Sequence, residues 1–408
     1  MLIDRFLNNM VREGEIEMDI GGAMPKRIGA PVPGQKPIRI SLKDRATARA
    51  IVRNPALGAA EAFMDGRLCV ADDDIWPLLD LIGHNVRWDW SNKNRVRLWR
   101  NTRWLNAILP RNDGTRAKAN VAHHYDLSDR LYALFLDTDW QYSCAYFDDP
   151  ANDLDDAQQA KLTHIAAKLA LQPGQRVLDI GCGWGGLALY LHKIAGVEVL
   201  GITLSEEQLS VARARAQEAG VADKVRFELI DYRDVSGTFD RIVSVGMFEH
   251  VGRKRYRNYF ETIRDRLADD GIALVHTIMR ADGPGKTDPF TTRYIFPGGY
   301  CPALSEVLPA IEQSWLWVSD IEILRLHYAY TLEQWYARVR ANRAEIVALY
   351  DERFYRMWCF YLASAIMAFR HDGHCNAQIQ LLRRRDAAPI TRDYMFENEI
   401  RLRAAGKS

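Results

Sequence analysis

The sequence predicts an α/β protein whose main domain is a mostly parallel, seven-stranded β-sheet covered by helices, with a small α+β domain before it. From residue 176 onward, apolar runs alternate with stretches long enough for the crossover helices that parallel strands require. Strands buried on both faces are recognised in sequence as nearly continuous apolar runs. Five such runs are RVLDI (176–180), VEVLGIT (197–203), KVRFELI (224–230), FDRIVSVGM (239–247) and GIALVHTIM (271–279).

The rhythm changes in the C-terminal part of the chain, after Trp315. A strand is expected near residues 319–325 and another near 376–382, with two aromatic-rich helices between them. An antiparallel pair at the edge of an otherwise parallel sheet fits this order.

The N-terminal residues predict a separate, smaller domain. A chain of 408 residues exceeds the usual size of one domain. Residues 1–83 contain two strand-like runs, EIEMDI and PIRISL, and two helical runs, ATARAIVRN and ALGAAEAFM. A basic stretch rich in tryptophan, residues 84–116, would then link this α+β domain to a main domain of residues 117–408.

Charge and cysteine content exclude several classes of function. The formal net charge is only +1, which gives no support for nucleic-acid binding. The six cysteines include no CxxC pair and no spacing typical of metal ligands, so we expect reduced thiols and no metal site.

Neither an export signal nor a membrane span is predicted. The first residues carry acids and lack the apolar core of a signal peptide. The most apolar long stretch, residues 357–369, is shorter than the roughly 20 residues of a spanning helix. We therefore expect a cytoplasmic protein that is soluble or peripheral to a membrane.

The motif VLDIGCGWGG joins an apolar strand to a helix through a glycine-rich turn. Gly181 and Gly183 allow a sharp turn and a close approach of backbone to ligand. Asp179 ends the strand, where its carboxylate can fix the turn or meet a cationic group. A pyrophosphate site for a dinucleotide is the competing interpretation, because glycine-rich strand-turn-helix units are widespread.

Two further polar residues follow the next strands at the same edge of the sheet. Gln208, after GITLSEE, is a candidate for binding ribose hydroxyls, and Asp231 a candidate for binding adenine. The alternatives are an exposed helix residue for Gln208 and a turn-forming aspartate for Asp231.

Six motifs together carry a family resemblance. They are HHYDLSDRLYALFLDTDWQYSCAYF (123–147), VLDIGCGWGG (177–186), GITLSEEQ (201–208), SVGMFEHVG (244–252), RYIFPGG (293–299) and LHYAYTLEQW (326–335). From about residue 117 to its end the chain resembles the cyclopropane-fatty-acyl-phospholipid synthase family. The N-terminal ALGAAEAFMDG looks like the lipid-binding domain of the bacterial phospholipid enzymes, which the mycolic acid cyclopropane synthases lack.

The resemblance implies a Rossmann-like class I methyltransferase fold, S-adenosylmethionine as cofactor and methyl transfer to the double bond of an unsaturated acyl chain. The cofactor-binding positions that it implies are Tyr142, Ser143, Asp179, Gly181, Cys182, Gly183, Thr203, Leu204, Gln208, Asp231 and Tyr232.

The resemblance also implies a bound bicarbonate ion, which removes a proton from the transferred methyl group as the cyclopropane ring closes. Cys144 and Ile278 would offer backbone groups to this ion, while Glu249, His276 and Tyr328 would hydrogen-bond it. A carboxylate beside an anion requires a shared proton, so we expect a raised pKa for Glu249. The alternatives are purely structural roles: His276 as an ordinary core residue, Cys144 as an inert buried thiol, and Glu249 as the cap of a helix starting near Arg253.

The chemistry implied here requires a dry, aromatic site, because water would trap a carbocation as an alcohol. Two other endings keep the methyl transfer and give a methylene or a methyl-branched chain. A different class of function is a non-catalytic lipid-binding protein.

The expected partner is unsaturated phospholipid at the inner face of a membrane, and a homodimer is possible. The stretch from Arg87 to Arg103 interleaves cations with Trp88, Trp90 and Trp99, a composition suited to anionic headgroups. A solvated helix between domains is the alternative.

Overall fold

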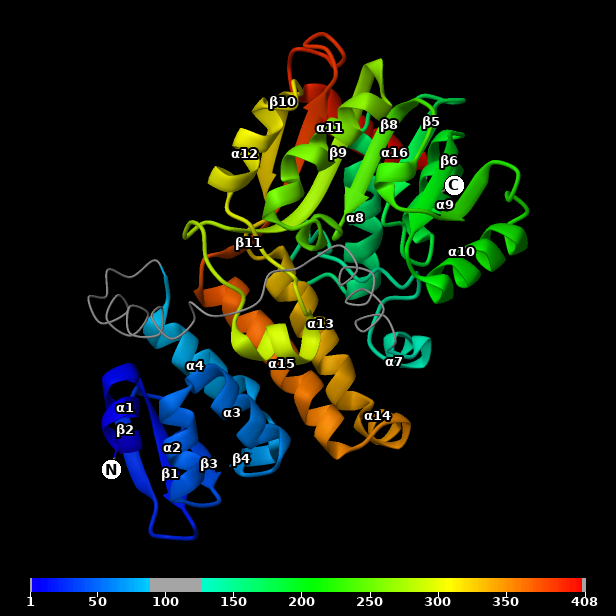
Figure 1. The fold of residues 1–408 in the computed structure, drawn as a ribbon. Coiled ribbons are helices and arrows are strands. Elements are labelled where there is room, and N and C mark those ends of the chain that lie inside the picture. Colours follow the sequence, from blue (N-terminus) through cyan, green and yellow to red (C-terminus); the bar gives the residue numbers. More distant parts are fainter. Residues whose placement is uncertain (1, 89–126, 406–408) are drawn as a thin grey trace. The chain divides into compact units, whose positions relative to one another are not determined.

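The computed structural model describes residues 2–88 and 127–405, which fall into two compact units (Figure 1). Most of the basic, Trp-rich stretch, including Trp90, Trp99 and Trp104, lies outside the described residues, as does the start of the HHYDLSD motif.

The first unit comprises Met1–Arg111, Thr287–Pro297 and Leu332–His374. Its four-stranded sheet has the order β2-β1-β3-β4, with β1 parallel to β3 and the other pairs antiparallel. The expected strands and helices are present together with elements that the sequence did not suggest. In chain order they are α1 (Leu2–Met10), β1 (Gly14–Ile20), β2 (Lys26–Ala30), β3 (Ile38–Leu42), α2 (Arg45–Arg53), α3 (Pro55–Met64), β4 (Leu68–Val70) and α4 (Trp76–Val86).

Two C-terminal helices complete the first unit, α14 (Arg343–Leu349) and α15 (Glu352–His371). Helix α15 packs against α3 and α4. It begins at the N-cap Asp351, whose side chain accepts a hydrogen bond from the amide of Phe354. Its apolar side chains, among them Trp358 and Leu362, are buried, as its composition predicts.

The second unit is built on a seven-stranded sheet with the order β10-β11-β9-β8-β5-β6-β7. All five expected apolar runs form strands, and β9, β8, β5, β6 and β7 pair in parallel. This confirms the predicted α/β fold with its mostly parallel sheet. The strands are β5 (Arg176–Ile180), β6 (Glu198–Thr203), β7 (Val225–Leu229), β8 (Phe239–Val245), β9 (Leu267–Arg280), β10 (Trp317–Ile323) and β11 (His374–Leu382).

The edge strand β10 pairs antiparallel with its neighbour β11, as expected. They are not a simple hairpin, because three helices separate them: α13 (His327–Ala341), α14 and α15. The break between α14 and α15 lies at Tyr350 and Asp351, which adopt non-helical backbone angles. The sequence predicts only two helices in this region.

Helices cover both faces of the second sheet. One apolar core joins α11 (Tyr256–Arg266) and α12 (Leu304–Glu312) to the sheet, and the other joins α8 (Leu154–Lys168), α9 (Gly186–Ala195) and α10 (Glu206–Glu218) to it. Helix α16 (Asp393–Ala405) packs against α8, and the short α7 (Asp129–Ala133) precedes α8. The carboxyl ends of the parallel strands therefore meet at one edge, where such folds bind ligands.

No helix within residues 2–88 and 127–405 is both long enough and apolar enough to cross a membrane.

Candidate active site

The glycine-rich turn lies between β5 and α9 at the carboxyl edge of the sheet. Gly181 and Gly183 have φ angles of 82° and 55°, a backbone region that other residues adopt at a cost. A Cβ at Gly181 would lie 3.0 Å from the Met247 side chain, whereas a Cβ at Gly183 would meet no atom within 4 Å. The turn therefore leaves open space beside Gly183, next to Cys182.

Asp179 lies near the end of β5, two residues before Gly181, and is 2% exposed. Its Oδ2 atom is buried and has no hydrogen-bond partner. Burial raises the pKa of Asp179 to about 7, and the nearby Lys161 ammonium partly offsets the rise. A buried carboxylate oxygen without a partner costs free energy, so this atom is a candidate to bind a ligand cation.

Gln208 is buried, so the alternative of an exposed helix residue is wrong. Its Oε1 accepts a hydrogen bond from Thr203 Oγ1 at 3.0 Å. Ser205 caps α10 by accepting from the Gln208 amide at 3.2 Å, and Leu204 between them is partly exposed. The end of β6 and the start of α10 thus hold Gln208 in one orientation at the ligand-binding edge.

Asp231 makes the contacts of a turn-forming residue. Its carboxylate accepts hydrogen bonds from Arg233 Nε at 2.7 Å and Arg233 Nη2 at 2.6 Å. It also caps the short 3₁₀ turn Tyr232–Asp234. The ring of Tyr232 packs edge-on against Tyr259, with ring centres 5.3 Å apart. Cofactor binding by Asp231 and Tyr232 stays a prediction.

The segment that carries Tyr142, Ser143 and Cys144 is held by α8. Gln158 Nε2 donates to the carbonyl oxygens of Gln141 (3.1 Å) and Ser143 (3.0 Å). Tyr142 packs edge-on against Tyr132 and Phe135. Residues 141–144 precede α8 and are called the α8 loop below, because α8 holds them. These contacts fix the backbone of the loop and the ring of Tyr142.

Glu249 and Ile278 come from neighbouring strand ends and are in direct contact. The Ile278 amide donates to Glu249 Oε1 at 2.5 Å, while Glu249 Oε2 is buried and unpartnered. Burial raises the pKa of Glu249, as expected. This contact rules out the alternative that Glu249 caps the next helix, which begins at Tyr256 with Arg255 as its N-cap.

His276 lies two residues before Ile278 in β9 and is 1% exposed. Burial, together with Lys161 and Lys168, lowers the pKa of His276 to about 3, so the ring is neutral near pH 7. Its Nδ1 lies 3.2 Å from the Gln378 side-chain amide, and its Nε2 lies 3.4 Å from that of Asn376. Both contacts are made by amide nitrogens, which only donate, and a neutral ring accepts at one nitrogen. One of the two amides must therefore turn its oxygen, which is otherwise without a partner, towards the ring N–H.

Cys144 and Tyr328 belong to two segments that are tied together. The amide of Ala145, next to Cys144, donates to Thr331 Oγ1 at 3.0 Å, one helical turn from Tyr328 in α13. Burial raises the pKa of the Cys144 thiol well above its usual range, so it is an inert thiol and not a nucleophile.

Gly246 joins these two parts of the site. Its amide donates to the carbonyl of His276 at 2.9 Å. A Cβ at Gly246 would lie 4.0 Å from the Cβ of Ser143. The α8 loop therefore lies against the end of β8, close to β9. Gly246, which it contacts there, stands three residues before Glu249 in the sequence. A shared role of Tyr328, Glu249 and His276 stays a prediction.

Sequence reasoning missed the polar residues behind the site. Lys161 and Gln158 of α8 are fully buried, as are the alternate residues Asn376, Gln378 and Gln380 of β11. The alternation of amides in NAQIQ was a signal of one polar, inward-facing side of a strand. Within residues 2–88 and 127–405, no group of three or more His, Cys, Asp or Glu could hold a metal ion.

A family model described as mycolic acid cyclopropane synthetase matches residues 112–379. The cyclopropane-fatty-acyl-phospholipid synthase of Escherichia coli K12 is 38% identical over 352 residues, which cover 86% of this chain and 89% of that protein. A Pseudomonas putida protein named "Probable fatty acid methyltransferase" is 42% identical over 61% of this chain and 65% of its own length, just under two thirds.

Among solved structures, a mycolic acid cyclopropane synthase, CmaA1, in complex with SAH and CTAB matches with a TM-score of 0.62 and 34% identity. The match covers 65% of this chain and 98% of that one. The match to the E. coli protein is longer than the whole chain from residue 112 onward, so it includes part of the N-terminal unit.

Proposed function

Because the chain belongs to the family of cyclopropane-fatty-acyl-phospholipid synthases and mycolic acid cyclopropane synthetases, we propose that it cyclopropanates cis double bonds in unsaturated phospholipids. The chain is an S-adenosylmethionine-dependent methyltransferase of the cyclopropane synthase type, acting on lipid acyl chains. The phospholipid is the finer part of the proposal. It is supported by the long match to the E. coli enzyme, since the mycolic acid synthase aligns with only 65% of the chain.

The residues at the glycine turn fit the cofactor. The unpartnered Asp179 Oδ2 suits the cationic amino group at its methionine end, and the open space beside Gly183 gives room for the ligand. Gln208 and Thr203 would meet the ribose, Asp231 and Tyr232 the adenine, and Tyr142, Ser143, Gly181, Cys182 and Leu204 would line the remainder. Bound there, S-adenosylmethionine supplies an electrophilic methyl group on a sulfonium centre.

The buried, unpartnered Oε2 of Glu249 is the observation that carries the proposed base site. Burial raises the pKa of Glu249 and thereby favours the protonated form, which could share its proton with bicarbonate. The Ile278 amide orients the carboxyl group by donating to Oε1. Cys144 through its backbone and Tyr328 through its hydroxyl would complete the set of groups that bind the ion. His276, whose two ring nitrogens both face amides of β11, would have to exchange one of these contacts for the ion.

The residues next to Glu249 help to keep water out. Phe248 is fully buried and packs against Tyr256, Tyr259 and Phe260 at ring distances of 4.5, 5.1 and 5.4 Å. Aromatic faces tolerate a nearby positive charge and contribute about 0.5–2 kcal/mol per contact. Methyl transfer leaves positive charge on the acyl chain. Loss of a proton from the new methyl group to the base then closes the three-membered ring.

The N-terminal residues, 1–83, would bind lipid, and the basic, Trp-rich stretch would bring the enzyme to the cytoplasmic face of a membrane. Four of its cations, Arg95, Arg97, Arg100 and Arg103, lie outside the described residues, so this part rests on composition and on the E. coli match. A homodimer remains part of the proposal.

A second candidate keeps the methyl transfer but ends in a methylene or methyl-branched chain. The Pseudomonas relative, 42% identical, is named "Probable fatty acid methyltransferase", and this name specifies methyl transfer without a ring, so it is compatible with this ending. The fold and cofactor would be the same, and the position of the base relative to the charged chain would decide between the products.

The test is incubation of the purified protein with vesicles of an unsaturated phosphatidylglycerol and S-adenosylmethionine labelled in its methyl group. The proposal expects one labelled methylene unit per double bond, in a product that resists mild catalytic hydrogenation. A product that takes up hydrogen would be a methylene chain and would support the second candidate. Absence of label in the lipid would contradict both.

A further inference from the structure

Lys161, near the middle of α8, is a charged residue at the site that neither the sequence motifs nor the proposed chemistry uses. Its side chain is 0% exposed. Its Nζ donates to Gln141 Oε1 at 2.5 Å and to Ser143 Oγ at 2.9 Å, both neutral acceptors in the α8 loop. Within the described part of the chain, no carboxylate lies within 4.0 Å of this ammonium.

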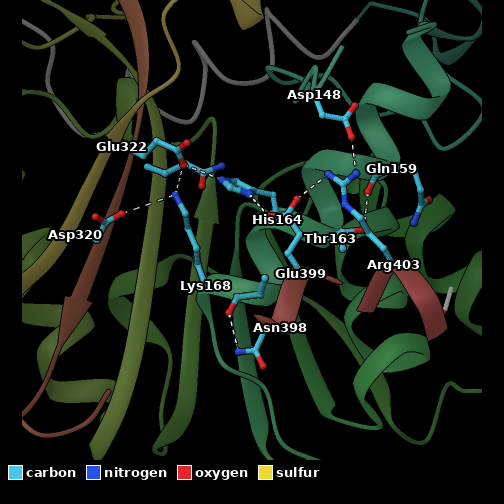
Figure 2. A network of polar contacts seen from close by, with 12 residues as sticks. Asp148, Gln159, Thr163, His164, Lys168, Asp320, Glu322, Asn398, Glu399 and Arg403 are labelled. Carbon is cyan, nitrogen blue, oxygen red and sulfur yellow. Dashed lines mark hydrogen bonds and ion pairs between the residues drawn. The ribbon is translucent and has the colours of Figure 1, made fainter. Parts of the chain in front are cut away.

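Lys168, two turns further along the same helix, shows how a buried lysine is usually neutralised. It pairs with Glu322 and Asp320 of β10, in the network that also includes His164 and Glu399 (Figure 2). An ammonium buried without such a partner costs several kcal/mol. The cost of burying the Lys161 ammonium must therefore be compensated by an interaction with a ligand or with more distant charges.

The electrostatic surroundings of Lys161 belong to the cofactor site. Burial lowers the pKa of Lys161 to about 8, although Asp137, Asp139 and Asp179 oppose this change. In return its charge helps to ionise Asp179 and to keep His276 neutral. One buried cation thus acts on residues of three separate segments of the site.

The contact with Ser143 fixes which way that hydroxyl can donate. A lysine ammonium only donates hydrogen bonds, so Ser143 Oγ is the acceptor in this contact. The hydroxyl proton of Ser143 must therefore be offered to a different acceptor. Ser143 is partly exposed and lies against Gly246, which directly follows β8 at the carboxyl edge of the sheet.

We propose that Lys161 is a positioning residue for the cofactor: its buried ammonium holds Ser143 Oγ so that the Ser143 hydroxyl donates to the α-carboxylate of bound S-adenosylmethionine. The inference rests on the proposed function, because Ser143 is assigned to the cofactor there. The carboxylate would also add a negative charge to those of Asp137, Asp139 and Asp179, none of which pairs directly with Lys161. Asp179 would take the ammonium of the same amino-acid group, so the two buried charges match the two ends of a zwitterion.

The first experiment measures binding of S-adenosylhomocysteine, which keeps the amino-acid group, by calorimetry to the full chain without lipid. Lys161→Met should weaken binding by about 10- to 100-fold, the range for a hydrogen bond to a charged group. The control is Lys168→Met, which removes another buried lysine of α8. This control should lower the thermal stability and change the affinity by no more than about twofold.

A double-mutant cycle tests the route through Ser143. If Lys161 acts through this hydroxyl, adding Lys161→Met to Ser143→Ala should weaken binding much less than Lys161→Met does alone. Fully additive losses, or wild-type affinity of Lys161→Met, would overturn the inference. Should Lys161→Met fail to fold, Ser143→Ala and the pH dependence below decide the matter.

The pH dependence provides a readout that a structural role would not change. Affinity in the wild type should fall as pH rises through the lysine titration, because the neutral amine is a weaker donor than the ammonium and can itself accept the Ser143 hydroxyl proton. The groups facing Lys161 are Asp137 and Asp139 before the loop, Cys144 within it and Asp179 on β5, and His276 of β9 responds to its charge. Cys144 keeps its proton there, and Asp179 titrates on the acid side of this limb.

Lys161→Arg, which stays charged at alkaline pH, should remove the alkaline fall in affinity. An alkaline fall that persists unchanged in Lys161→Arg would overturn the inference. Failure of the vesicle assay with intact cofactor binding would instead count against the proposed lipid reaction alone. Complete loss of binding in the wild type would reject the cofactor assignment on which both depend.

Discussion

Replacement of Glu249 by glutamine separates the chemical role of this residue from its structural one. The wild-type carboxyl accepts from the Ile278 amide at 2.5 Å through Oε1, and its other oxygen is buried and unpartnered. The amide oxygen of the introduced glutamine can still accept from Ile278, and its NH2 group replaces an oxygen that already lacks a partner, so the free energy of unfolding should change by no more than about 1 kcal/mol. Glutamine cannot share or exchange an acidic proton with a bound anion, which removes the function proposed for the free oxygen.

The expected loss of methyl transfer in Glu249→Gln is about 100-fold or more, the usual contribution of a general acid or base. Glu249→Leu is the matched comparison, because it removes the carboxyl group and, unlike Glu249→Gln, leaves the buried Ile278 amide without an acceptor. That variant should lose a further 1–3 kcal/mol of stability, by the usual cost of about that size for an unsatisfied buried group.

The assay combines transfer of labelled methyl into vesicles, thermal unfolding and calorimetric binding of S-adenosylhomocysteine. Both variants should bind this ligand like the wild type, since Glu249 contacts β9 and not the glycine turn. A Glu249→Gln enzyme with activity within about threefold of the wild type would refute the reasoning.

Three further predictions concern stability and membrane binding. Burial opposes a charge on His164, but its hydrogen bonds to Glu322 and Glu399 (Figure 2) leave its pKa raised. The stabilisation of the folded state by protonated His164 is therefore complete below about pH 6.5 and is lost as pH rises through the folded-state pKa. In thermal unfolding, the stability lost in His164→Gln relative to the wild type should therefore shrink from pH 6 to pH 9. A loss of stability that stays constant with pH would disprove this. A Cβ at Gly201 would lie 2.5 Å from the Phe227 ring, so Gly201→Ala should cost about 1–3 kcal/mol in urea unfolding, and an unchanged midpoint would reject the packing argument. Replacing four arginines of the basic stretch by glutamine should weaken co-sedimentation with anionic liposomes, and unchanged binding would be the contrary result. The four residues are Arg95, Arg97, Arg100 and Arg103.

The sheet of the second unit could be predicted because parallel strands buried on both faces leave a strong local signal. VLDI and GIALVHTIM are short and mostly apolar with several β-branched residues, and glycine-rich or polar segments bound them, which favours strands over buried helices. The glycine turn was equally visible, since close backbone approach to a ligand leaves few residue choices. The antiparallel pairing of β10 and β11 followed from their place at the end of the sheet.

The residues behind the site could not be predicted in the same way. Lys161 stands in LDDAQQAKLTHIAAK, which reads as a polar surface helix, although its lysines are buried by contacts far away in sequence. Likewise, Gln378 faces His276 across 102 residues. Composition shows that α15 is buried, but its packing against α3 and α4 depends on long-range contacts. Such pairings are properties of the assembled fold and not of any local pattern.

The central claim is that an anion bound beside Glu249 removes the proton that allows the ring to close. It is tested most directly by measuring methyl transfer into dioleoylphosphatidylglycerol vesicles in carbonate-depleted buffer, with and without added bicarbonate. We predict a slow reaction that bicarbonate restores in a saturable way, with a cyclopropane product. An equal rate in depleted buffer would contradict the claim.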